Sequence, residues 1–245
     1  MLDIPIEDLL SLLVIMIAIV INLIVATKSF KSYRANKLTQ TVLFGLTSLG
    51  MALAMIFLVG EKVFLSAILQ NGDMGLIVGS IAIILSGVTV ATVDSFAFNM
   101  PWPRKFKLLT IIAIIPIIVY LSLWMYSVWS NPMGSILWKP DGSGEIQVNS
   151  ITQLAVYFTM VPLLIIPVLV FFYYAVKVRK ESPISSKRSW VLGLGVMLIS
   201  IAYIFEIIGA AALLAIPYFS TFMRVFFSIG AILNYWALFR IKSKQ

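Results

Sequence analysis

The sequence predicts an all-α integral membrane protein, a bundle of seven transmembrane helices. Three observations predict this fold class. First, 61% of the 245 residues are hydrophobic and only 11% are charged, with a mean hydropathy of +1.03, whereas soluble domains carry roughly 25% charged residues. Second, seven apolar stretches are each long enough to cross a bilayer. Third, the Lys and Arg residues between these stretches gather on one predicted side.

Each predicted span is a stretch of about 20 mostly apolar residues, the length that a helix needs to cross the hydrocarbon core. The sixth and seventh spans are separated only by Pro217 and Tyr218, which predicts a tight helical hairpin. We expect a single membrane domain, residues 1–245. Its spans are predicted at about 9–26, 40–59, 75–98, 108–129, 151–176, 190–216 and 219–239.

The basic residues predict how the bundle is oriented. With seven spans, the first, third and fifth loops share one side with the carboxyl-terminal tail, and together they hold most of the 18 Lys and Arg residues. Because Lys and Arg favour the cytoplasmic side of short loops, we expect the N-terminus outside and the C-terminus in the cytoplasm. The predicted location is a prokaryotic cytoplasmic membrane, in which the chain is a multi-pass protein.

Composition also argues against several partners and chemistries. A net charge of +8 would suit nucleic-acid binding, but the loop positions of the basic residues are explained by topology and by contact with anionic lipid headgroups. We therefore expect the lipid bilayer, and no nucleic acid, as a partner. The chain has no His and no Cys, so imidazole bases and thiolate ligands are lacking. No catalytic residue, metal or cofactor is expected.

Two irregular segments interrupt the predicted bundle. The loop at residues 130–150, on the expected external side, has short β-prone runs around a Pro-Asp-Gly turn. This pattern predicts a small β-hairpin, with an unstructured connector as the alternative. In the fifth span, Pro162 and Pro167 each remove an intrahelical hydrogen bond, so this helix is the best candidate for a bend.

Charges within the predicted spans define a candidate ligand site in the outer half of the bundle. Glu206 in the sixth span and Arg224 in the seventh have similar depths, so their side chains could form an ion pair. Tyr203 and Ser228 each lie one helical turn from a member of this pair and extend the polar cluster. The cluster has two interpretations, a polar ligand or ion site that opens outward and a structural contact that locks the last two helices. Arg224 could also extend to the outer interface.

A second polar group lies near the inner end of the third span, where Asp94 is followed by Ser95 and Asn99. Asp94 could pair with Arg104 or another base of the inner loop, cap the helix end, or take part in proton movement. These three residues form a candidate inner polar site.

The residues can be compared with known seven-helix functions. Retinal is not expected as a ligand, because the last predicted span offers Arg224 and no Lys for a Schiff base. None of the 10 prolines precedes Gln, so the Pro-Gln dipeptides of small seven-helix sugar carriers are missing. The Gly-x-Gly-Asp sequence of intramembrane aspartyl proteases and the phosphate-binding loop of nucleotide hydrolases are missing too.

The segment Ser186–Gly195, SKRSWVLGLG, leads from a basic loop directly into a Leu- and Gly-rich helix. In this pattern and in its seven-span layout, the chain resembles the seven-helix membrane sensor region that precedes prokaryotic histidine kinases. The resemblance implies stimulus reception within the membrane. Because the sequence ends at Gln245 without a kinase, we expect output through a separate membrane or cytoplasmic protein partner. The preferred function is a non-enzymatic, receptor-like sensor, and the alternatives are a transporter or channel component and a structural subunit of a membrane complex.

Overall fold

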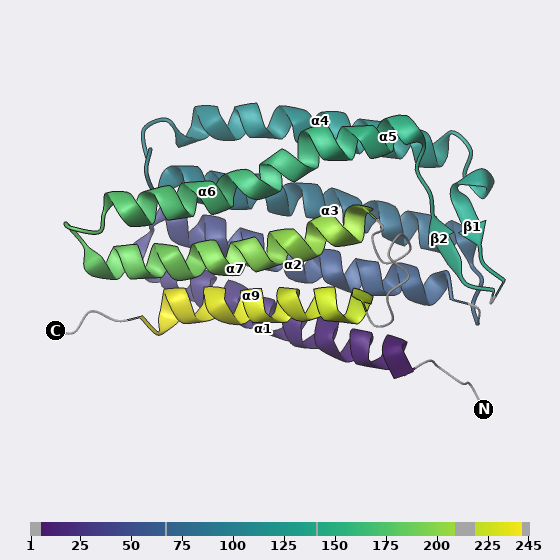
Figure 1. Cartoon of the computed structure of the whole chain (residues 1–245), viewed down its shortest axis with the longest axis horizontal. Helices are drawn as coiled ribbons and strands as arrows, with labels where there is room; N and C mark the ends of the chain where they lie inside the picture. Colours follow the sequence, from purple (N-terminus) through teal and green to yellow (C-terminus); the bar gives the residue numbers. More distant parts are fainter. Residues whose placement is uncertain (1–5, 67, 141, 209–218, 242–245) are drawn as a thin grey trace.

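The computed structural model describes residues 6–66, 68–140, 142–208 and 219–241, with the side chains of 6–9, 206–208 and 220 left undescribed. In these ranges, seven helices are long and apolar enough to cross a membrane. This finding confirms the predicted all-α bundle of seven spans. The helices run along the long axis of the molecule, and α1 begins at the end opposite to that at which α9 finishes (Figure 1).

The seven spans follow one another along the chain, and the fifth span consists of three consecutive segments, α5, η2 and α6. The elements are α1 (Ile6–Asn36), α2 (Thr39–Phe64), α3 (Gly72–Asn99), α4 (Phe106–Trp129), η1 (Met133–Ser135), β1 (Ile136–Trp138), β2 (Gly144–Ile146), α5 (Ser150–Ala155), η2 (Val156–Met160), α6 (Val161–Lys177), α7 (Pro183–Ile208) and α9 (Phe219–Phe239).

Several helices extend beyond the predicted apolar spans. α1 continues past Lys28 and Lys31 to Asn36, because long basic side chains can lie along a helix while their charged ends reach water. α7 begins early, at Pro183, since proline at a first helical position needs no partner for a backbone N–H. α3 begins where the side chain of Asn71 accepts a hydrogen bond from the backbone N–H of Met74 at 3.1 Å. Residues 209–218, which include the end of the predicted sixth span, lie outside the described part of the chain.

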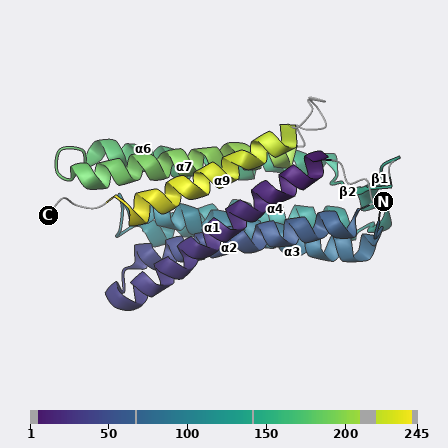
Figure 2. The same cartoon turned by 90° about the horizontal axis from the view of Figure 1, so that it is seen from below.

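The helices form a closed ring. Each packs against its neighbours in sequence from α1 to α4, α4 packs against α5 and η2, and α6, α7 and α9 continue the ring until α9 packs on α1. α3 also packs against α6 across the ring. Figure 2 shows α6, α7 and α9 on one side and α2 and α3 on the other, with α1 crossing obliquely between them. The apolar core therefore lies between these two groups, and the outer surfaces carry exposed Leu, Ile and Val side chains suited to lipid.

A close contact between helices joins α7 to α9 at two glycines. A Cβ atom added at Gly195 would lie 2.9 Å from the carbonyl oxygen of Gly230, and one added at Gly230 would lie 2.6 Å from the oxygen of Gly195. Only glycine leaves room for backbones this close, as at other membrane helix contacts made by small residues. The two helices are therefore held tightly together.

The fifth span contains an irregular segment just before its first proline. η2 is a π-helical stretch in which the N–H of Val161 bonds to the oxygen of Val156. Pro162 and Pro167 follow in α6, and proline removes the intrahelical bond that an N–H would make. The ribbon steps obliquely from the level of α5 to that of α6 (Figure 1).

The loop between α4 and α5 contains an antiparallel β-hairpin that packs against the ends of α2 and α3. β1 and β2 pair with Ile136 opposite Ile146, and the N–H of Gly144 bonds to the oxygen of Leu65 at 2.6 Å. We call this end of the bundle the hairpin end. The opposite end, which holds the connections 36–39, 99–106 and 177–183, is called the basic end after its Lys and Arg residues.

Candidate ligand cavity

A cavity of about 280 Å³ lies inside the ring of helices, and all seven spans and the β-hairpin contribute to its lining. Along α2 it extends from Phe44 to Lys62, about 27 Å at 1.5 Å per residue. Most of the side chains that line it are apolar, and the charged ones lie at the hairpin end. The cavity is therefore elongated, apolar along its walls and polar at its ends.

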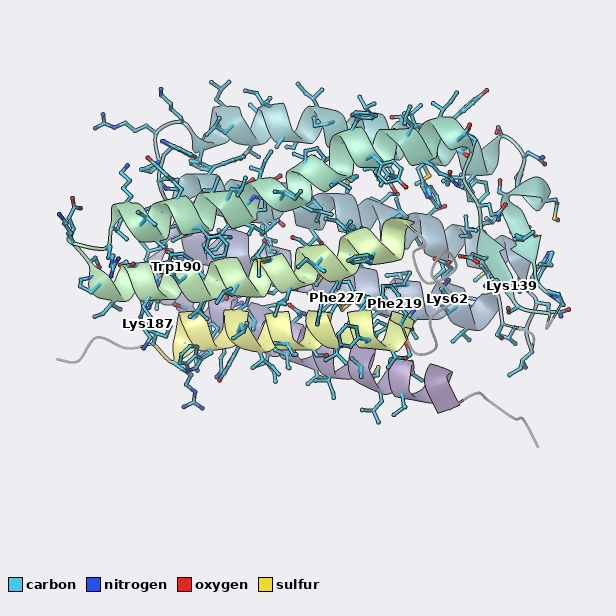
Figure 3. All side chains as sticks on the ribbon, viewed as in Figure 1. Lys62, Lys139, Lys187, Trp190, Phe219 and Phe227 are labelled. Atoms are coloured by element: carbon cyan, nitrogen blue, oxygen red, sulfur yellow. The ribbon has the colours of Figure 1, made fainter. Side chains whose placement is uncertain are left out.

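Charged side chains surround the cavity at the hairpin end. Glu61 on α2 is only 8% exposed, and its carboxylate faces the backbone of Gly79 on α3. The ammonium of Lys62 lies 3.8 Å from Oε1 of Glu61, and Lys139 and Glu145 on the β-hairpin form an ion pair of 3.0 Å. Figure 3 shows Lys62 and Lys139 at this end of the bundle. These ion pairs place both positive and negative charges at the hairpin end of the cavity.

Halfway along, the cavity is lined by aromatic, hydroxyl and proline side chains. Trp124 of α4 and Tyr203 of α7 both line it, so Tyr203, a member of the predicted outer site, faces the cavity. Ser200 of α7 lines it as well and donates a hydrogen bond to the oxygen of Leu164 on α6 at 2.9 Å. Pro167, also in the lining, is close in sequence to this carbonyl. Hydroxyl side chains commonly satisfy carbonyls near a membrane proline.

Toward the basic end, the cavity is limited by an aromatic cluster. Phe44, which lines the cavity, packs edge-on against Phe96 with ring centroids 5.0 Å apart, and Phe96 contacts Phe171 at 5.6 Å. The lining also includes the amide side chains of Asn22 and Asn234. Asn234 is 7% exposed, and among the described residues its Oδ1 has no hydrogen-bond partner. This oxygen faces Gly195 on α7, where an added Cβ atom would collide with it.

Two other members of the predicted outer site, Arg224 and Ser228, face α1. The guanidinium of Arg224 donates a hydrogen bond to the hydroxyl of Ser11, and the hydroxyl of Ser228 donates to the oxygen of Val14 at 2.8 Å. Both residues therefore hold α9 against α1. Glu206 belongs to α7, but its side chain lies outside the described part of the chain.

The predicted inner polar site has one buried carboxyl group. Asp94 is fully buried, and within the described residues neither of its oxygens has a hydrogen-bond partner. Ser95 turns to α4, where it accepts a hydrogen bond from the hydroxyl of Thr110 at 3.0 Å. Asn99 is buried at the last position of α3. The predicted pairing of Asp94 with Arg104 is therefore not formed in the described structure, and the three residues point to different surroundings.

The cavity could hold a ligand through several kinds of non-covalent contact. Apolar walls, hydroxyl and amide side chains, and charged groups at the hairpin end are suited to holding an amphipathic molecule. In the described ranges, no group of three or more His, Cys, Asp and Glu side chains could hold a metal ion.

Several lining residues were not singled out from the sequence. Ser86 and Thr89 follow one another at helical spacing on α3, and both line the cavity. That spacing is a signal for a polar stripe on one helix face, but hydroxyl residues with such spacing also satisfy carbonyls within their own helix. Glu61 was visible as a charge near a span end, yet only the rotation of α2 decides that it faces inward.

Comparisons with protein-family models, with curated proteins and with solved structures find no match for this chain. The resemblance to the sensor region of prokaryotic histidine kinases therefore stays a prediction from the sequence.

Proposed function

We propose that this chain is a non-enzymatic, receptor-like membrane sensor. It binds a small amphipathic molecule in the central cavity and signals through a separate partner protein at the basic end. The proposal places the hairpin end outside and the basic end in the cytoplasm of a prokaryotic cell, as the distribution of Lys and Arg favours.

The observation that carries the proposal is the cavity inside the ring. An apolar cavity of about 150 Å³ in a protein core is enough to bind benzene, and ligand pockets usually begin at about 300 Å³. A volume of about 280 Å³ therefore suits a molecule roughly twice the size of benzene. Its apolar part would lie beside Met51 and Met55, and its polar end beside Glu61 or Asn234, which all line the cavity.

Contacts among the last helices offer a route for the signal. Ser200 lines the cavity and bonds to Leu164, so a ligand that displaces it also acts on α6 next to Pro167. α7 is tied to the end of α9 at the basic end, where Arg188 donates from Nε and Nη2 to the oxygen of Ile241 at 3.0 and 2.6 Å. A small shift of α6 and α7 at the cavity would therefore reach the surface at which a partner binds.

Ligand binding can be tested with a cavity-filling variant and a matched control. The chain in lipid nanodiscs is titrated with a naphthol, a fused two-ring alcohol, and empty nanodiscs give the background. Ser86→Leu places a larger side chain in the cavity and should lower the saturable binding at least tenfold. Val88→Leu changes the same helix at a position that is 50% exposed and should leave binding unchanged. Equal binding by both variants, or none by the unaltered protein, would contradict the proposed site.

The manner of output needs a separate experiment. Purification from native membranes in mild detergent should recover a signalling partner, and reconstituted vesicles should show no solute flux. Flux that is lost in Glu206→Gln while folding is retained would instead identify a transporter. Instability of the chain when it is expressed alone would favour a structural subunit of a larger complex.

A further inference from the structure

At the basic end, α1 and α9 bring two cationic side chains to one phenol group. Lys28 of α1 donates a hydrogen bond from Nζ to the hydroxyl oxygen of Tyr235 on α9 at 2.6 Å. Arg240, just beyond the end of α9, is close enough to interact electrostatically with the same phenol. Lys28 and Arg240 are exposed, whereas Tyr235 is half-buried between them. The cluster therefore lies on the surface, where the two ends of the helix ring meet.

Among the described residues, this cluster holds hydrogen-bond donors and no acidic side chain. Lys and Arg can only donate hydrogen bonds, and a phenol oxygen that accepts one still has its own proton to give. In the described part of the chain, neither Lys28 nor Arg240 forms an ion pair with an acidic side chain within 4 Å. Two positive charges and a phenol group that converge without an acidic side chain in the described residues are suited to a phosphate oxygen.

Aromatic rings lie beside the cationic groups of the cluster. Nζ of Lys28 lies 4.7 Å from the ring centroid of Tyr235 and 5.7 Å from that of Phe239. Trp236, which is 42% exposed, lies on the same helix, and Nζ of Lys187 is 5.9 Å from its ring. Tyr and Trp gather where the hydrocarbon meets the headgroups. A cluster of this composition is therefore suited to the level of the lipid headgroups.

Exposed apolar side chains continue from the cluster toward the middle of the bundle. Ile24 lies one turn before Lys28 on α1 and is 44% exposed, and Ile232 lies one turn before Tyr235 on α9 and is 49% exposed. A molecule with its phosphate at the cluster would have an apolar surface for attached acyl chains. A free phosphate ion would make no use of that surface.

We propose that Lys28, Tyr235 and Arg240 form a binding site for the phosphate of an anionic phospholipid, with its acyl chains against α1 and α9. The site lies outside the central cavity and does not depend on what the cavity binds. It joins the first and last helices, so a bound lipid would stabilise the closure of the ring.

The site can be tested by native mass spectrometry of the detergent-purified protein titrated with phosphatidylglycerol or phosphatidylcholine. Lys28→Gln and Arg240→Gln should each weaken phosphatidylglycerol binding about fivefold, the effect of about 1 kcal/mol per basic residue near a membrane surface. Tyr235→Phe keeps the ring but removes the hydroxyl, and should weaken binding as well. Lys28→Arg should retain it. Phosphatidylcholine should bind the unaltered protein more weakly, because its choline cation offsets the charge of its phosphate.

Lys177→Gln is the matched control, because Nζ of Lys177 lies 6.0 Å from the ring of Tyr173 on its own helix, α6. It should bind phosphatidylglycerol as the unaltered protein does. An equal loss in Lys177→Gln and Lys28→Gln would mean that basic charge acts diffusely, and the assigned site would be wrong. Displacement of phosphatidylglycerol by an equal concentration of inorganic phosphate would likewise overturn the lipid assignment. Thermal unfolding of each variant separates lost binding from lost folding.

Discussion

Replacing Asp94 should make the protein more stable, because its carboxyl group is fully buried without a partner. Asp94 is 0% exposed, and in the described part of the chain neither oxygen makes a hydrogen bond. A charged residue at the centre of a membrane helix costs roughly 2.5–3.5 kcal/mol. Asp94 lies about 7.5 Å from the end of α3 at Asn99, so we expect roughly half of this cost. Asp94→Leu should therefore raise the free energy of unfolding by about 1–2 kcal/mol.

The free energy can be measured by titrating the protein with sodium dodecyl sulfate in mixed micelles and following its tryptophan fluorescence. Asp94→Asn, which keeps the shape, should be neutral or slightly stabilising. The neighbouring Ser95→Ala removes the acceptor of the bond from Thr110 and should destabilise by about 0.6 kcal/mol, so the two positions should change stability in opposite directions. If Asp94→Asn and Asp94→Leu both destabilised the protein by more than about 1 kcal/mol, the carboxyl group would have a stabilising partner. The reasoning from its unpaired state would then be refuted.

Three further predictions concern helix packing and topology. Gly195→Val should destabilise the protein by about 1–3 kcal/mol, because its Cβ would meet the backbone of α9, whereas Leu194→Val at a lipid-facing position should have little effect on the unfolding temperature. Ser200→Ala should cost about 0.6 kcal/mol through loss of the bond from α7 to α6; an unchanged unfolding midpoint would show that this bond contributes nothing. Since the chain has no Cys, single-cysteine variants can report topology. A membrane-impermeant maleimide should label Lys139→Cys in intact cells and Lys177→Cys only after permeabilisation. The reverse labelling pattern would contradict the proposed orientation.

The sequence predicts the seven helices well because each must present about 20 apolar residues to lipid. Their ends are less predictable, since the helical bonds continue wherever the backbone can form them, whether or not the side chains are apolar. α1 extends over Lys28 and Lys31 for this reason, and Pro183 begins α7 before its apolar stretch. Hydropathy locates the part of a helix that lies in lipid, and capping residues locate its ends.

The candidate site was harder to predict, because depth in the membrane does not reveal which way a helix is rotated. Tyr203 and Arg224 were grouped by depth, yet Tyr203 lines the cavity and Arg224 bonds to Ser11 on α1. Arg224 contacts α1 because α9 packs against α1. The spacing of residues along one helix does not reveal the order of the helices around the ring. The same closure brings Lys28 to Tyr235 from opposite ends of the chain.

Photolabelling would test the central claim, a ligand cavity inside the seven-helix ring, most directly. The protein in nanodiscs is irradiated with a medium-chain alcohol that carries a diazirine, and the labelled residues are identified by mass spectrometry. A cavity ligand predicts saturable adducts on residues of the lining such as Met51, Met55 and Tyr203, and excess unlabelled alcohol should compete with them. Adducts confined to lipid-facing positions such as Ile84 and Ile111, without competition, would contradict the cavity as a ligand site.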